Sequence, residues 1–386
     1  MRHLVLDVET TTSNKGNPFD ETNKLCYIGL LSNGSCWLSD IEYSDSANRD
    51  VLDSVQNTIS GYDIIVGFNI KFDLHWIKRY GINFYDKRIW DCQLVHFILT
   101  GQKESYPSLN GVAQYYGLDS KLDVVASEYW SAGIDTPDIP RDILEDYLKQ
   151  DLVLTEQIYL KQLEQVNQSS IQLQRLVSLH NQDLMVLQEM EFNGLIYNEQ
   201  RSEELANELN EQIRQIDQTL FEYHNCSEFN PNSVDHLSAF LYGGSIRLRR
   251  KEPCGYFKSG SRKGEPKDRW VDYEVSFERL VKPLKGSELA KEGLYSTDEP
   301  TLRSLKGTNK AKEIIELLLK RAELEKRVST YYTGLLDLRK KSNWKEGTVH
   351  GQLNQCVVRT GRLSSSKPNM QNFDGEIKDL FLSRFA

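Results

Sequence analysis

Two acidic side chains near the N-terminus stand at a spacing that would let both reach one metal ion. Asp7 and Glu9 follow the apolar run 4–6 and are two residues apart. Alternate side chains of a strand share a face, so both carboxylates would lie on the same side. Such a pair is more often a solvated strand edge, so further ligands are needed before it indicates a site.

Two other segments offer those ligands. Asp73 follows the apolar run 64–66 and lies at the start of a stretch with helical periodicity. Tyr147 and Asp151 are four residues apart in a long expected helix and therefore share a face. Taken alone, Asp73 could cap a helix and the second pair could be an ordinary surface face. Their coincidence with the first pair favours a common site.

Four crowded carboxylates would repel one another without cations. Their hard oxygen atoms suit Mg²⁺ or Mn²⁺. Two such ions about 4 Å apart can activate a water and stabilise the leaving oxygen of a phosphodiester, and a tyrosine hydroxyl can orient that water. We therefore expect a two-metal hydrolytic site whose catalytic residues are Asp7, Glu9, Asp73, Tyr147 and Asp151, the four carboxylates being the metal ligands.

The elements around these residues predict an α/β domain over residues 1–166. Strands are expected at 4–6, 24–31, 35–38 and 64–66, and helices at 72–80, 107–116 and 141–165. The dipeptide Asn33-Gly34 predicts a tight hairpin between the second and third strands.

The next part, 167–345, is expected to be mostly helical. A break falls at Asn193-Gly194, and Asn232-Ser233 and Asp298 are expected to begin further helices. Residues 245–295 are basic and punctuated by Gly and Pro, and they resemble a long loop or small insertion. Residues 346–386 turn β-like again.

Charge is distributed unevenly along the chain, whose net charge is −9. Residues 1–165 hold 14 Lys and Arg against 25 Asp and Glu, a net −11, whereas residues 245–345 hold 25 against 15, a net +10. This asymmetry suits a nuclease that binds metal in one region and phosphates in another, although charged faces also simply keep proteins soluble. No apolar run approaches the roughly 20 residues of a membrane span, so we expect no membrane association and a cytoplasmic protein, in the host cytoplasm if its source is a phage.

The same residues resemble a known family. The segments 6–11 and 69–73, with Tyr147, Asp151 and Thr155, resemble the three exonuclease motifs of family A DNA polymerases, in the tyrosine branch of the DEDD nucleases. The resemblance implies an RNase H-like exonuclease domain that removes nucleotides from a single-stranded 3′ end, with Thr10 and Asn69 at the DNA.

Later segments carry the resemblance further. Residues 190–194, 229–233 and 296–331 are similar to the start of the polymerase region and its thumb, and 350–372 is similar to the segment beside the primer–template duplex. The resemblance implies DNA contacts for Arg362, at the minor groove near the primer end, and for three amides near the template, Asn369, Gln371 and Asn372. Without it, residues 360–365 would be taken as a surface loop.

The resemblance also leads to an expectation about the missing palm. The first palm carboxylate of the family would follow Ala386, so 346–386 is expected to be an incomplete palm whose remainder, with the fingers, comes from a second polypeptide. A truncated piece of a single-chain polymerase is equally compatible with the sequence. The unfinished edge would expose apolar side chains at 380–382 and at Phe385.

Two other functions stay open. A free-standing nuclease of the ribonuclease D type would use the same motifs on RNA, and a DNA-versus-RNA digestion separates the two. A non-catalytic clamp with a vestigial site is the other alternative, against which the complete set of four carboxylates and one tyrosine argues.

Overall fold

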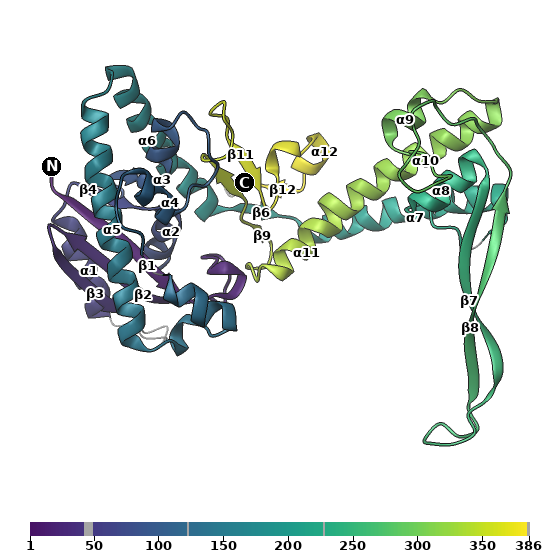
Figure 1. The fold of residues 1–386 in the computed structure, drawn as a ribbon, viewed down its shortest axis with the longest axis horizontal. Helices are drawn as coiled ribbons and strands as arrows, with labels where there is room; N and C mark the ends of the chain where they lie inside the picture. Colours follow the sequence, from purple (N-terminus) through teal and green to yellow (C-terminus); the bar gives the residue numbers. More distant parts are fainter. Residues whose placement is uncertain (42–48, 122, 227, 384–386) are drawn as a thin grey trace. The chain divides into compact units, whose positions relative to one another are not determined.

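The computed structural model describes residues 1–41, 49–121, 123–226 and 228–383 (Figure 1). The chain forms two compact units, Met1–Glu199 with Leu335–Ala386 and Gln200–Gly334. By packing, residues 167–199 and the C-terminal segment therefore group with residues 1–166. No helix in the described part of the chain is both long and apolar enough to cross a membrane.

The first unit is built on a five-stranded sheet of order β3-β2-β1-β4-β5. Its strands are β1 (His3–Thr10), β2 (Leu25–Ser32), β3 (Ser35–Asp40), β4 (Ile64–Gly67) and β5 (Arg88–Asp91). Strands β1, β4 and β5 are parallel, and β2 runs antiparallel to both of its neighbours. The expected hairpin is confirmed, because Asn33 and Gly34 join β2 to β3 with φ angles of 49° and 79°, which a two-residue turn of this kind requires.

Helices cover both faces of this sheet (Figure 1). One apolar cluster joins the sheet to α1 (Arg49–Ser60), α2 (Lys71–Arg79) and α3 (Cys92–Leu99). A second cluster joins the opposite face to α4 (Leu109–Tyr115) and the long α5 (Arg141–Asn167). Short turns of 3-10 or π type precede α5: η1 (Ser13–Lys15), η2 (Val125–Tyr129), η3 (Trp130–Ala132) and η4 (Thr136–Asp138).

The remainder of the first unit includes α6 (Ile171–Asn193). This helix ends at Gly194, as expected. Its other elements are β6 (Leu195–Tyr197), β9 (Thr348–Val349), β10 (Gln352–Asn354), β11 (Ser364–Ser366), η6 (Met370–Asn372), α12 (Gly375–Lys378) and β12 (Phe381–Leu382). Strand β6 lies between β9 and β12, and β10 pairs with β11.

The expectation that residues 380–382 form an exposed apolar edge is wrong in part. Leu380 is buried, and β12 is paired with β6. The Phe381 ring stacks on Phe373, so only Leu382 of this group is exposed. Phe385 lies outside the described residues.

The second unit contains α7 (Glu199–His224), α8 (Val234–Tyr242), β7 (Gly244–Tyr256), β8 (Pro266–Phe277), α9 (Glu299–Ser304), α10 (Asn309–Arg327) and η5 (Val328–Tyr332), and α11 (Thr333–Lys341) continues from η5. Ser233 and Asp298 cap α8 and α9 with their side chains, which confirms both expected helix starts.

The expected loop at 245–295 is wrong for its first part. Strands β7 and β8 pair antiparallel from Gly244↔Phe277 to Tyr256↔Pro266 and extend from α8 as a two-stranded ribbon (Figure 1). Only the base of this ribbon is apolar, where Ile246 and Leu248 are buried. The outer part carries runs of charged residues, such as 249–252 and 267–269, so the hydrophobic period of two that marks a strand is missing there.

Candidate active site

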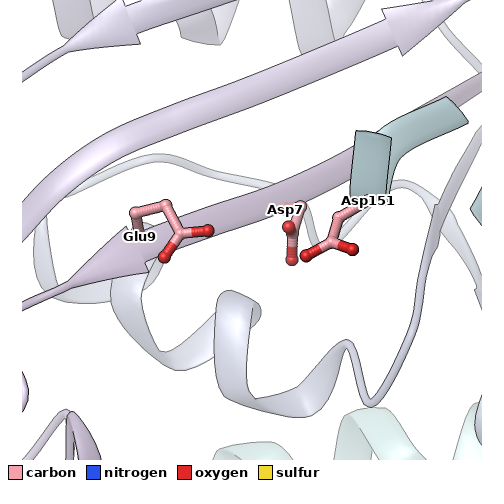
Figure 2. Close-up of side chains that lie close together, drawn as sticks. All are labelled: Asp7, Glu9 and Asp151. Atoms are coloured by element: carbon pink, nitrogen blue, oxygen red, sulfur yellow. The ribbon is translucent and has the colours of Figure 1, made fainter. Parts of the chain in front are cut away.

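Strand β1 brings the first two carboxylates to one face of the sheet. Asp7 is half-buried and Glu9 is buried, and Figure 2 shows both side chains extending from β1 toward the same space as Asp151 from α5. One carboxylate oxygen from each of Asp7, Glu9 and Asp151 lies within 4.8 Å of the other two. Three of the four expected ligands therefore form one cluster.

Gly29 allows α5 to approach the sheet closely enough for this cluster. It pairs with Asp7 across the β1–β2 ladder. A Cβ atom at Gly29 would lie 2.7 Å from Leu152 Cδ1 and 3.0 Å from Leu148 Cδ1, distances that real Cβ contacts do not allow. The absence of a side chain at Gly29 therefore makes room for the leucines of α5, the helix that carries Asp151.

Asp73 comes from the first turn of α2 and is buried. Its Oδ1 atom accepts a hydrogen bond of 3.0 Å from the amide of Val8, the residue between Asp7 and Glu9. It is not within the three-carboxylate cluster, but it lines the same cavity, whose volume is about 460 Å³. Among the other residues lining this cavity are Thr10, Asn69, Phe72, Trp130 and Tyr147.

Sequence reasoning missed Lys121. Its ammonium donates a 2.6 Å hydrogen bond to Asp151 Oδ2, lies 2.5 Å from Asp151 Oδ1, and sits 3.7 Å from the centre of the Tyr147 ring. The segment that carries Lys121 has no regular periodicity, so no sequence signal could have placed it. A protein cation is thus already held against the carboxylate cluster.

The electrostatics of the cluster follow from its burial. Burial, and then the neighbouring charge of Asp151, raise the pKa of Asp7 well above its usual value. The pKa of Glu9 is raised by burial and then by Asp7, and burial likewise raises the pKa of Asp73 and of Asp151, the latter against the opposing effect of Lys121. Ionising these groups together is costly unless more positive charge is present.

Tyr147 stays protonated in this environment. Burial, followed by the charges of Asp151 and Glu9, raises the pKa of Tyr147 far above its usual value. The ring packs edge-on against Trp130, with 5.8 Å between centroids, which fixes its direction. Its hydroxyl is therefore a hydrogen-bond donor placed at the rim of the carboxylate cluster.

The donor set fits a divalent cation. Asp151 Oδ1 is buried and lies 2.5 Å from the Lys121 ammonium, so this oxygen already faces a positive charge. All ligand atoms are carboxylate oxygens, which Mg²⁺ and Mn²⁺ prefer. Asp7, Glu9 and Asp151 would hold one ion, and Asp73 offers a further carboxylate at the same cavity.

A second cavity of about 450 Å³ adjoins the first. Both are lined by Lys15, Asn69 and Phe72. The second cavity is polar and is also lined by amide side chains, lysines and rings, including Asn14, Asn17, Tyr106, His350, Gln352, Asn354 and Lys367.

Sequence reasoning also missed the role of Glu191, at the wall of the second cavity. Its Oε1 accepts hydrogen bonds from Lys71 Nζ at 2.6 Å and from the Leu353 amide at 2.5 Å, and its Oε2 is 2.9 Å from His75 Nε2. Glu191 therefore ties α2, which carries Asp73, to α6 and to β10. The only sequence signal was its place in the segment 190–194.

The remaining expected DNA contacts lie outside these cavities. Arg362 is exposed in the turn before β11. Asn369 caps η6 by accepting from the Gln371 amide, and Gln371 Nε2 donates to the Leu363 carbonyl. Asn372 is exposed at the end of η6. The four residues belong to one exposed stretch, separate from the carboxylates.

Comparisons with known proteins agree on one family. A model of DNA polymerase family A matches residues 273–383. DNA polymerase I of Bacillus caldotenax is 32% identical over 199 residues, which cover 51% of this chain and 17% of that protein. DNA polymerase I of Synechocystis sp. is 27% identical over 325 residues, 81% of this chain and 28% of that protein. Over residues 273–383 this chain is therefore similar to the family A DNA polymerases.

One solved structure has a similar fold. The POL domain of Pol1 from M. smegmatis, in complex with DNA primer-template and dNTP, matches with a TM-score of 0.63 and 18% identity, covering 98% of this chain and 54% of that one. The family A model spans Arg362 and the three amides but not the carboxylate cluster. The chain spans 17% and 28% of the two relatives named above. These matches support the expected family, and the phage type stays a prediction.

Proposed function

We propose that this chain is a metal-dependent 3′→5′ DNA exonuclease that serves proofreading in a family A polymerase. The observation that carries the proposal is the meeting of Asp7, Glu9 and Asp151 within 4.8 Å, in a cavity that Asp73 and Tyr147 also line. The five-stranded mixed sheet with helices on both faces supports the RNase H-like assignment of the unit that holds them.

Each residue has a chemical task in this proposal. When bound, two Mg²⁺ or Mn²⁺ ions supply a nucleophilic hydroxide and stabilise the leaving oxygen. Asp7, Glu9 and Asp151 would hold these ions beside the scissile phosphate. Asp73 fixes the geometry of β1 through its hydrogen bond with the Val8 amide. The protonated Tyr147 hydroxyl donates a hydrogen bond that orients the attacking water. Lys121 holds Asp151 in place through its ion pair.

The adjoining cavities support a strand end as substrate. A terminal nucleotide in the carboxylate cavity would have its 5′ neighbours in the second cavity, past Asn69 and Phe72, which line both. Amides and lysines there can bind phosphates and bases of any sequence. We expect the substrate to be an unpaired strand, because bases in a duplex are held by their partners and cannot lie singly in the two cavities.

Digestion of end-labelled oligonucleotides tests this function. With Mg²⁺, the full chain should shorten 5′-labelled single-stranded DNA stepwise from its 3′ end, and it should leave the matched RNA largely intact. Asp7→Ala and Asp151→Ala should each lower the rate by at least about 10³-fold, since each removes a ligand of the metals. Asp53→Ala, which removes an exposed carboxylate on α1, should leave it unchanged. Full activity of a folded Asp7→Ala variant would overturn the assignment, and faster cleavage of RNA would favour the ribonuclease D alternative.

We also propose that the exposed stretch with Arg362, Asn369, Gln371 and Asn372 contacts the primer–template duplex. A short arginine-bearing turn with amide side chains can read groove acceptors regardless of sequence. Arg362→Ala should weaken binding of a primed duplex without changing digestion of a single strand. The expected second polypeptide with palm and fingers stays a prediction.

A further inference from the structure

The β7–β8 ribbon concentrates positive charge in an acidic chain. Residues 244–277 hold nine Lys and Arg and five Asp and Glu, a net +4, whereas the whole chain carries −9. Near the base of the ribbon each cation has a partner across or along the strands: Arg247 pairs with Glu274 and Arg249 with Asp272. The base is therefore close to electrically neutral.

The outer part of the ribbon differs, because its cations outnumber its anions. Lys258, Lys263 and Lys267 make no ion pair with any residue that the structure describes, and all three are exposed. Arg262 pairs with Glu265 at the tip. Three lysines are thus available to an outside partner that carries negative charge.

Exposed aromatic rings accompany these lysines. Trp270 is 59% exposed and Tyr256 is 67% exposed. Trp270 lies opposite Lys251 in the ladder, with the ammonium 5.3 Å from its ring centre. No large aliphatic side chain of residues 244–277, all of which the structure describes, is exposed. A protein partner would normally bury aliphatic surface as well, so this pattern does not favour one.

We propose that the β7–β8 ribbon is a binding arm for single-stranded DNA. Flat rings stack on unpaired bases, whatever their identity, and nearby lysines neutralise the phosphates between them. A duplex offers its phosphates but hides the base faces, so it would use the lysines and leave Trp270 and Tyr256 without a role. The arm belongs to the second unit and the carboxylate cluster to the first. Binding of single-stranded DNA by the arm therefore does not depend on nuclease activity.

The experiment measures fluorescence anisotropy of labelled oligo-dT with the full chain in EDTA, where metal-dependent cleavage cannot interfere. The triple variant Lys258→Gln, Lys263→Gln, Lys267→Gln should weaken binding and lower the slope of log affinity against log salt by about 2. Trp270→Ala should weaken binding roughly 5- to 150-fold, the range for loss of one stacked base, and Trp270→Phe should restore most of it.

Matched variants provide the controls. Arg49→Gln, Lys103→Gln, Lys161→Gln removes three exposed cations from the other unit, and Trp37→Ala removes a ring that is 42% exposed on β3. Both should bind oligo-dT like the unchanged protein. An equal loss in the cation control would show that only net charge matters and would overturn the proposal.

Two further probes separate other partners. If Trp270→Ala weakens binding of duplex DNA as much as binding of oligo-dT, the single-strand assignment is overturned. It is also overturned if poly-glutamate, at equal charge, displaces the labelled oligo-dT as strongly as unlabelled oligo-dT does. Nuclease activity on a short oligonucleotide, measured separately with Mg²⁺, should be the same in the ribbon variants and in the unchanged protein. A failed ribbon proposal and a failed exonuclease assignment therefore give different results.

Discussion

Asp73 Oδ1 accepts a hydrogen bond of 3.0 Å from the backbone amide of Val8. The contact joins α2 to β1 at the residue between Asp7 and Glu9, so the helix carboxylate also sets the position of the strand carboxylates. One side chain thereby serves both the fold and the candidate metal site, and these two roles can be separated by mutation.

Asp73→Asn keeps an oxygen that can accept from Val8 but removes the negative charge. We expect its melting temperature to stay near that of the unchanged protein, while the nuclease rate falls by at least about 10²-fold for want of a metal ligand. Asp73→Ala should also lose about 1.5–3 kcal/mol of stability with the charged hydrogen bond. Thermal unfolding and digestion assays measure the two effects. A fully active Asp73→Asn variant would exclude Asp73 from the metal site.

Divalent ions should stabilise the first unit. Burial and mutual repulsion raise the pKa values of Asp7 and Glu9, so a bound cation removes a cost that the folded state otherwise carries. Mg²⁺ at 100 times its dissociation constant should add about 2.7 kcal/mol, seen as a higher melting temperature. Asp7→Asn should abolish most of this increase, and the exposed-site control Asp53→Asn should retain it. An increase of the same size in Asp7→Asn would place the binding ion elsewhere.

Tyr147→Phe should have a smaller effect than loss of a carboxylate. The phenol orients water and holds no metal in this proposal, so the rate should fall by roughly 10- to 10³-fold. The Mg²⁺-dependent increase in melting temperature should persist, because the metal ligands remain. The measurement compares the rates of Tyr147→Phe and Asp151→Ala at saturating Mg²⁺, and equal rates would show that the role of Tyr147 is misassigned.

Gly29→Ala, on the strand β2 that pairs with β1, should also disturb the site. The new methyl would lie 2.7 Å from Leu152 Cδ1, so the leucine side chains of α5 must give way, and we expect the helix and Asp151 to shift with them. Overpacking of this kind costs about 1–3 kcal/mol, and a displacement near 1 Å can cost about 10²-fold in rate. Gly375→Ala is the control, because no neighbour lies within 4 Å of the added methyl. Unchanged rate and stability in Gly29→Ala would show that α5 is not held by this contact.

Glu191→Gln should destabilise the chain in a pH-dependent way. Burial raises the pKa of Glu191, but hydrogen bonds from His75 and the charge of Lys71 outweigh it, and the pKa of Glu191 lies below its usual value of about 4.5. Its contribution is therefore present above about pH 4.5 and is lost as the pH falls through the lowered value. The variant should lose about 3–5 kcal/mol at pH 7, and the difference should shrink below about pH 4.

Denaturant unfolding at pH 7 and at pH 3.5 measures this difference. Glu189→Gln is the matched control on the same helix, since Glu189 pairs with Lys78 but is 42% exposed, and exposed pairs contribute little. A destabilisation by Glu191→Gln that is the same at both pH values would mean that the charge of Glu191 is not what matters.

Local sequence determined much of this protein. The Asn33-Gly34 hairpin, the caps at Ser233 and Asp298, and the break at Gly194 depend on the backbone preferences of a few adjacent residues, and all are found where expected. The placement of Asp7 with Glu9 follows from the period of a strand, and that of Tyr147 with Asp151 from the turn of a helix. Such features need no knowledge of distant contacts.

Tertiary structure alone decided the rest. Lys121 reaches Asp151 across 30 residues, and Glu191 reaches Lys71 across 120 and Leu353 across 162, contacts that no local period encodes. The β7–β8 ribbon was missed because its outer strands face solvent on both sides, so no apolar residue every second position marks them. Asp7 and Asp151 come together where α5 packs over Gly29 of β2, and this close approach of helix to sheet exists only after all three elements have packed together.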